Sequence, residues 1–102
     1  MSDFQNLQDE AHLNSTQHGF WHGLVPKDVH TGLIKLALIT SEVGEAVEAL
    51  RTKDEMGFGE ELADIVIRVM DLAGAWDLNL AEIICAKQAK NRARPYLHGK
   101  LA

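Results

Sequence analysis

Two acidic pairs, each set into an apolar stretch, limit how this chain can fold. The first pair is Glu42-x-x-Glu45 and the second is Glu61-x-x-Asp64. Residues three positions apart are neighbours on one face of an α-helix, so each pair directs two carboxylates the same way. The segment 51–59 between the pairs contains two glycines that break the helical pattern. An antiparallel helical hairpin would therefore bring four carboxylates together.

The acidic residues lie inside or beside the apolar stripes of their helices. At about 100° per residue, Glu42 lies between Ile39 and Ala46 on one side and further apolar residues on the other. Glu61 lies beside Ile65. Carboxylates gathered at a poorly hydrated edge either take up protons or bind a cation, and a hard divalent ion prefers oxygen ligands. We therefore expect Mg²⁺, with Mn²⁺ as a substitute, at Glu42, Glu45, Glu61 and Asp64. A solvated helix face is the alternative that the pattern leaves open.

The two acidic motifs also resemble those of a known family. Glu-x-x-Glu with Gly44 inside it, a spacer, and then Glu-x-x-Asp within the run GEELADIVI is similar to the MazG-like nucleotide pyrophosphohydrolases of the all-α nucleoside triphosphate pyrophosphatase superfamily. The resemblance spans roughly residues 30 to 100. It implies Mg²⁺-dependent hydrolysis of a nucleoside triphosphate to the monophosphate and pyrophosphate, in house-cleaning of the nucleotide pool. Family members often carry two adjacent acids at the start of the first motif, and here the earlier position is Ser41.

A polar series near the C-terminus matches a second family pattern. Lys87, Asn91 and Arg94 reproduce a Lys-x-x-x-Asn-x-x-Arg series whose members contact the phosphates or sugar of the substrate, and Tyr96 follows. Without the resemblance, the same cations would simply stabilise a helix C-terminus. Lys35 lies two turns before the first acidic pair. It is expected either to meet a phosphate oxygen or to neutralise the acids.

The segment 19–27 has two glycines, a proline and two aromatic residues, so it is predicted to be a loop. Phe20 and Trp21 are expected either to stack on the nucleobase or to plug the end of the helical bundle. Trp21 is retained as a candidate substrate contact. His12 and His18 are interpreted as surface histidines with no catalytic role.

Capping residues and apolar periodicity predict four helices and an all-α fold, with residues 1–102 forming a single domain. Within the third helix, Arg68 is expected to pair with Asp64, and Asp71 is expected to be an exposed partner of Arg68. The predicted helices run from Ser2 or Asp3 to about Leu13, from Asp28 to about Thr52, from about Phe58 to Trp76, and from Asn79 to before Pro95.

The apolar residues of the second and third helices cover more surface than two short helices can bury. Leu36, Val43 and Val47 mark one face, while Ile67 and Met70 belong to a wide arc on the other helix. We therefore predict a four-helix core that is completed by dimerisation, which makes the protein a homodimer or a tetramer of two such pairs.

Composition excludes several other classes of protein. The formal net charge is -5 and there is no tract rich in Lys or Arg, so nucleic acid is not an expected partner. Cys85 is the only cysteine, which excludes an intramolecular disulfide. No signal peptide or apolar run of membrane-spanning length is recognised, so we expect a cytoplasmic protein without a membrane partner.

Three questions stay open from the sequence. A non-catalytic adaptor with an acidic docking surface would explain the amphipathic helices as well as an enzyme does. Related pyrophosphatases act on dUTP, dCTP or phosphoribosyl-ATP, and the motifs do not choose among these substrates. The residue that takes a proton from water is undecided, with Glu45 and Glu48 as the candidates.

Overall fold

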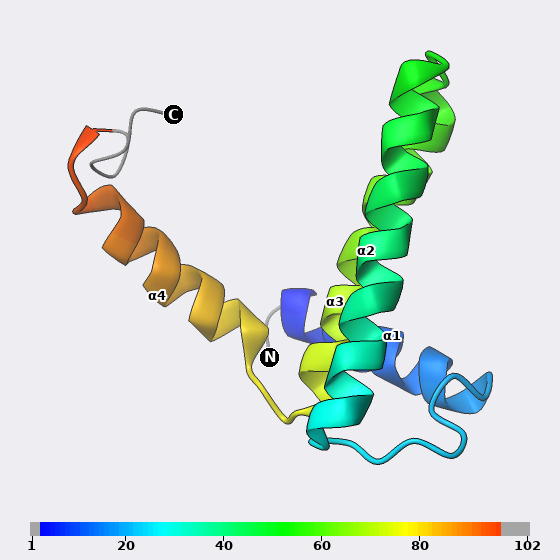
Figure 1. Ribbon diagram of the computed structural model, residues 1–102. Helices are drawn as coiled ribbons and strands as arrows, with labels where there is room; N and C mark the ends of the chain where they lie inside the picture. The colour runs from blue at the N-terminus through cyan, green and yellow to red at the C-terminus, as the bar shows by residue number, and fades with distance from the viewer. Residues whose placement is uncertain (1–2, 97–102) are drawn as a thin grey trace.

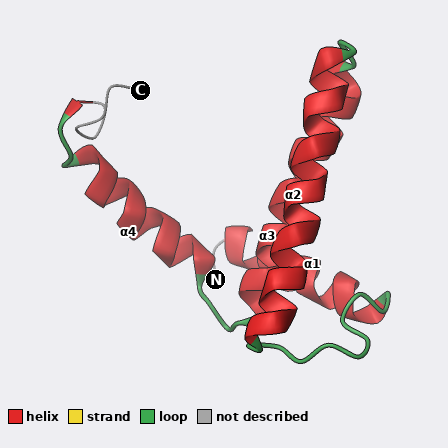
Figure 2. Ribbon diagram, viewed as in Figure 1, coloured by secondary structure: helices red, strands yellow, loops and turns green. Residues whose placement is uncertain are grey.

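A computed structural model describes residues 3–96, and every regular element in this range is an α-helix (Figures 1 and 2). The all-α prediction is confirmed. None of these helices combines the length and the apolar character that crossing a membrane requires. The helices are α1 (Asp3–Gln17), α2 (Val29–Arg51), α3 (Glu55–Ala75) and α4 (Leu80–Arg92).

Helices α2 and α3 form the predicted antiparallel hairpin, which stands upright in Figure 1. The chain reverses over residues 52–54, and α3 begins at Glu55 rather than near Phe58. The earlier start follows from Asp54, whose carboxylate accepts a hydrogen bond from the Gly57 amide at 2.9 Å and so caps the helix. A Cβ atom on residue 57 would collide with that carboxylate. The glycine therefore permits the cap and does not break the helix.

Helix α1 crosses the base of the hairpin and packs on α3 (Figure 1). It continues to Gln17, four residues beyond the predicted end at Leu13. Close approach of the two helices depends on Gly74, because a Cβ atom there would lie 2.9 Å from the Cβ atom of His12. A side chain at position 74 would consequently push α1 off α3.

Helix α4 begins, as predicted, after Asn79, whose side chain accepts a hydrogen bond from the Glu82 amide. It then runs away from the hairpin, and no residue along it is buried (Figure 1). The Cα radius of gyration is 15.7 Å, whereas about 13 Å is typical of a compact domain of this length. The projecting helix accounts for this extended shape.

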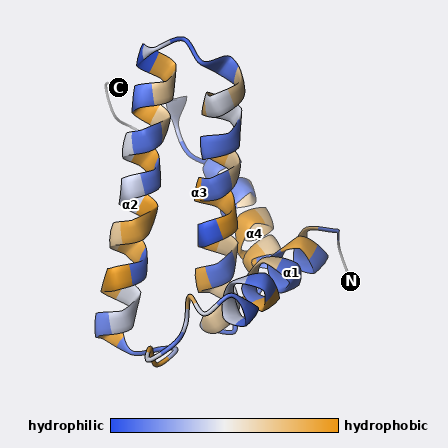
Figure 3. Ribbon diagram, turned by 90° about the vertical axis from the view of Figure 1, so that its right-hand side faces the viewer, coloured by the Kyte–Doolittle hydropathy of each residue, from blue (hydrophilic) through white to orange (hydrophobic). Residues whose placement is uncertain are grey.

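The single chain buries little of its apolar surface. Of the six apolar residues that are buried within residues 3–96, four are alanines and the other two are Trp21 and Met70. Large residues such as Leu33, Val47 and Leu50 are more than half exposed, and hydrophobic residues recur along α2 and α3 in Figure 3. The accessible surface is 7570 Å², compared with about 5,700 Å² expected for a folded monomer of this mass. The chain thus leaves uncovered much of the apolar surface that a finished core would bury.

Candidate metal and nucleotide site

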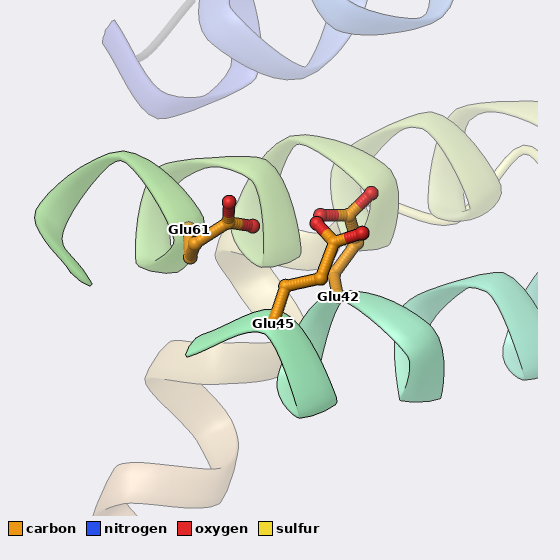
Figure 4. Close-up of side chains that lie close together, drawn as sticks. All are labelled: Glu42, Glu45 and Glu61. Atoms are coloured by element: carbon orange, nitrogen blue, oxygen red, sulfur yellow. The ribbon is translucent and has the colours of Figure 1, made fainter. Parts of the chain in front are cut away.

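Three carboxylates meet in the groove between α2 and α3 (Figure 4). Glu42 and Glu45 come from α2 and Glu61 from α3, and each offers an oxygen atom within 4.8 Å of the other two. Glu42 and Glu61 are half-buried, whereas Glu45 is exposed. The helical spacing of the first motif and the short turn of the hairpin produce this cluster, which we call the acidic cluster: Glu42, Glu45 and Glu61.

The pKa values of Glu42 and Glu61 are shifted in opposite directions because the surroundings of these two carboxyl groups differ. Burial raises the pKa of Glu61 from its ordinary value of 4.5 to about 7, and the neighbouring Glu42 and Glu45 contribute to the rise. Burial also acts to raise the pKa of Glu42. The Arg68 guanidinium, together with the neighbouring carboxyl groups of Glu61 and Glu45, outweighs that effect, so the pKa of Glu42 lies below its ordinary value.

The acidic cluster has the oxygen atoms that a hard divalent cation requires. Oε2 of Glu42 and Oε2 of Glu61 are both buried and make no hydrogen bond within the part of the chain that the structure describes. A buried acceptor without a partner is costly, and it is rare in folded proteins. Carboxylate oxygens are preferred ligands of Mg²⁺ and Mn²⁺. These residues therefore fit a divalent cation.

Asp64, the fourth expected ligand, lies one helical turn after Glu61 on α3. It is exposed and is not among the residues whose oxygens lie within 4.8 Å of one another. Asp64 instead lines a neighbouring cavity together with Glu42 and Arg68. The structure therefore brings three of the four predicted ligands together and places the fourth beside them.

Arg68 does not form the expected pair with Asp64. Its Nε atom donates a hydrogen bond to Oε1 of Glu42, across the helix pair, at 2.9 Å. The prediction was wrong because it considered α3 alone. The Glu42 side chain is only 13% exposed, and a carboxylate so poorly hydrated gains more from a guanidinium than exposed Asp64 does.

Asp71 is buried and does not serve as an exposed partner of Arg68, so this prediction is corrected as well. Its Oδ1 atom lies 2.8 Å from Nδ1 of His12 and accepts a hydrogen bond from Nε1 of Trp21 at 2.9 Å. Its Oδ2 atom accepts a hydrogen bond from Ser15 Oγ at 2.6 Å. His12 is likewise not a simple surface residue. We call this group, Asp71 with His12, Ser15 and Trp21, the Asp71 node.

Trp21, in the loop that joins α1 to α2, packs against Lys35 of α2. Both are buried, and the Lys35 ammonium lies 4.3 Å from the centre of the Trp21 ring. Lys35 Nζ also donates a hydrogen bond to the carbonyl oxygen of Phe20 at 2.7 Å. Burial lowers the pKa of Lys35, although the Asp71 carboxylate opposes part of this change. Trp21 thus occupies the end of the bundle, while Phe20 remains 56% exposed.

A cavity of about 560 Å³ lies between α1 and α3, next to the acidic cluster. Its apolar lining includes Ala11, Ile67 and Met70, and Phe20 belongs to its wall. Its polar lining includes Asp64, Arg68 and Asp71 of α3, Glu42 of α2, and Glu10, Asn14, Ser15 and His18. Such a cavity, mostly apolar with a few convergent polar groups, is typical of a small-molecule site.

The expected phosphate-binding residues lie on or just after α4, away from the acidic cluster (Figure 1). Lys87, Arg94 and Tyr96 are exposed, and Asn91 is half-buried. Among residues 3–96, no ion pair joins Lys87 or Arg94 to an acidic residue of the cluster. Residues 97–100, which follow Tyr96 and include Lys100, lie outside the described residues. The single chain therefore does not bring the acidic and basic parts of the expected site together.

Sequence reasoning missed the Asp71 node. One signal was present, because His12 and Ser15 are three residues apart and so share a face of α1. Nothing local indicated that this face would meet Asp71, which follows 56 residues after Ser15. The contact depends on how α1 crosses α3.

The helical hairpin and its cluster of carboxylates define an all-α protein with three acidic side chains that could hold a metal ion. Among family models, that of the MazG nucleotide pyrophosphohydrolase domain matches residues 30–97. The match covers more than half of the chain, which therefore belongs to this family. Comparisons with curated proteins and with solved structures each gave no match.

Proposed function

We propose that this protein hydrolyses a nucleoside triphosphate to the monophosphate and pyrophosphate in the presence of Mg²⁺, with Mn²⁺ as a substitute. Membership of the family supports nucleotide pyrophosphohydrolase activity in general. The observation that carries the proposal is the pair of buried, unpartnered oxygens on Glu42 and Glu61. A docking surface for another protein would present solvated carboxylates instead.

In this proposal Glu42, Glu45 and Glu61 hold the ion, and Asp64 completes the set from the adjoining cavity wall. A bound divalent cation neutralises phosphate charge and lowers the pKa of a bound water. Glu45 is the exposed member of the cluster and is placed to accept a proton from water. Glu48 is the alternative acceptor, one turn further along α2 and also exposed.

The nucleoside part of the substrate is assigned to the cavity between α1 and α3. A volume of about 560 Å³ suits a ligand of this size. Phe20 is better placed than Trp21 to stack on a base, because the Trp21 ring already faces Lys35. Trp21 and Lys35 contribute by supporting the loop that carries Phe20.

A second copy of the chain is proposed to complete the site. The excess of exposed apolar surface on α2, α3 and α4 requires a partner. In a homodimer, or a tetramer made of two dimers, Lys87, Asn91, Arg94 and Tyr96 of one subunit would approach the triphosphate bound by the other. Asn91 supports this assignment, because its buried Oδ1 atom has no hydrogen-bond partner in the described chain.

The direct test is pyrophosphate release from a panel of canonical and modified nucleoside triphosphates, with Mg²⁺ and with EDTA. Mg²⁺-dependent release from at least one of them is expected, and the panel includes dUTP and dCTP. The adaptor alternative would be favoured if no nucleotide released pyrophosphate and if neither Mg²⁺ nor nucleotides changed the melting temperature.

Light scattering at micromolar concentration tests the assembly. We expect a mass of at least twice 11.3 kDa. An active monomer would contradict both the shared site and the covered apolar faces. A cytoplasmic location is also part of the proposal, consistent with a single cysteine that can form no internal disulfide.

A further inference from the structure

One positive side chain touches the acidic cluster within residues 3–96, and it is Arg68. Its Nε atom lies 2.9 Å from Oε1 of Glu42. The other oxygen of Glu42 is buried and has no hydrogen-bond partner within residues 3–96. Arg68 therefore supplies part, and only part, of the positive charge that the three carboxylates require.

Arg68 pairs with an acidic residue on α2, although two acidic residues lie close to it on its own helix. Asp64 and Asp71 lie four residues before and three residues after Arg68, at the spacings where helical neighbours pair. Arg68 nevertheless reaches across to Glu42 on α2. The side chains of both partners are largely shielded, with 31% of Arg68 and 13% of Glu42 exposed. Removing one member of such a pair leaves an uncompensated charge in a poorly hydrated place.

A divalent ion bound by the acidic cluster would stand near this guanidinium. Two cations that share one carboxylate repel each other, and the repulsion is strong where water is scarce. We propose that Arg68 is a built-in counter-ion of the metal-free site, which competes with the divalent ion for Glu42 and so lowers the affinity for that ion. This inference rests on the metal site of the proposed function.

The Arg68 side chain has space to move away from Glu42 when a divalent ion binds. It lines the cavity between α1 and α3, where Asp64 also lies. Binding of the ion would thus shift Arg68 towards the cavity assigned to the nucleoside.

The test is a titration of the nucleotide-free protein with Mn²⁺, followed by electron paramagnetic resonance of the free ion. Arg68→Met removes the charge, and Arg68→Gln removes the charge but keeps a hydrogen-bond donor for Glu42. Both variants are expected to bind Mn²⁺ at least about fivefold more tightly than the wild type, because a nearby repulsive charge has gone. Arg68→Lys keeps the charge and is expected to stay within about twofold of the wild type.

Arg51→Met is the matched control. Arg51 carries the same charge at the end of α2, 75% exposed and outside the acidic cluster. Its loss is expected to change Mn²⁺ affinity by less than about twofold, since exposed distant charges are screened by salt. Circular dichroism confirms folding, and the Mn²⁺-induced rise in melting temperature gives a second readout that is expected to be larger in Arg68→Gln than in the wild type.

Unchanged or weaker Mn²⁺ binding in both neutral variants would overturn the inference. Weaker binding would identify Arg68 as a residue that orients Glu42 towards the ion. If the proposed metal site itself is wrong, the result is distinguishable, because neither the wild type nor any Arg68 variant would then bind Mn²⁺.

Discussion

Helix α3 contributes acidic groups to two neighbouring places, and the two are completed in opposite ways. Asp71 is buried, and His12, Ser15 and Trp21 surround its two oxygens. Glu61 shares its groove with two other carboxylates and has a buried oxygen that finds no hydrogen-bond partner among the described residues. A buried carboxylate that the chain itself satisfies is a structural element, whereas one that the chain leaves unsatisfied marks a place for something from outside.

The largest expected effect is a loss of catalytic activity on substitution of Glu61, the carboxyl group with an unpartnered oxygen among the described residues. Glu61→Gln keeps the shape of the side chain but removes its capacity to carry a negative charge. We expect kcat/KM for pyrophosphate release to fall by about 100-fold or more, because metal-assisted charge stabilisation supplies several kcal/mol of the barrier reduction. The circular dichroism spectrum should be unchanged.

Glu60→Gln is the matched control for this comparison. Glu60 is the preceding residue on α3, and it is exposed and outside the acidic cluster. Its replacement should leave activity within about twofold, as surface substitutions away from functional features usually do. Equal losses in both variants would remove the acidic cluster from the mechanism.

The next largest expected effect is a loss of stability on substitution of Asp71, whose oxygens are hydrogen-bonded within the chain. Asp71→Ala leaves His12, Ser15 and Trp21 without their acceptor, and we expect the free energy of unfolding to fall by about 3 kcal/mol. Denaturant titration measures the loss, which should be the same with and without Mg²⁺. A destabilisation that Mg²⁺ reverses would show that Asp71 belongs to the metal site.

The smallest effect is a dependence of stability on pH. The pKa of Glu61 is raised by folding, so the folded protein binds more protons than the unfolded chain between pH 4.5 and about 7. Its contribution to the stability of the metal-free protein is therefore fully present below pH 4.5 and is lost as the pH rises through 7. Thermal melting in EDTA should show this decline in the wild type. Glu61→Gln should show less of it, and an identical decline in both proteins would contradict the assignment.

Local patterns allowed the hairpin and all three members of the acidic cluster to be predicted, although Asp64, the fourth expected ligand, lies beside the cluster. The apolar residues around Glu42 indicated that it faces the groove, and the two three-residue spacings placed the carboxylates. The partner of Arg68 and the burial of Asp71 could not be predicted, because both depend on residues brought close by helix packing. The start of α3 was misjudged because two glycines were given more weight than the cap at Asp54.

The position of α4 shows a different limit on prediction. Asn79 correctly indicated where the helix begins. The pattern of Lys87, Asn91 and Arg94 gives a face of that helix but no direction in space, and few contacts within the chain fix its direction. In the proposed dimer, the position of α4 would depend on the apolar surface that the second copy covers.

The way α1 is attached has a consequence for how such proteins diversify. The family match starts at residue 30, whereas α1 ends at Gln17 and is fastened to α3 through Asp71 and the close approach at Gly74. Helix α1 forms one wall of the cavity but contributes nothing to the acidic cluster. Mutations in α1 can therefore reshape the cavity while the carboxylates stay in place. Under the proposed function, α1 would influence which nucleotide is preferred, whereas α2 and α3 would carry the carboxylates needed for hydrolysis. These two properties could then evolve at different rates.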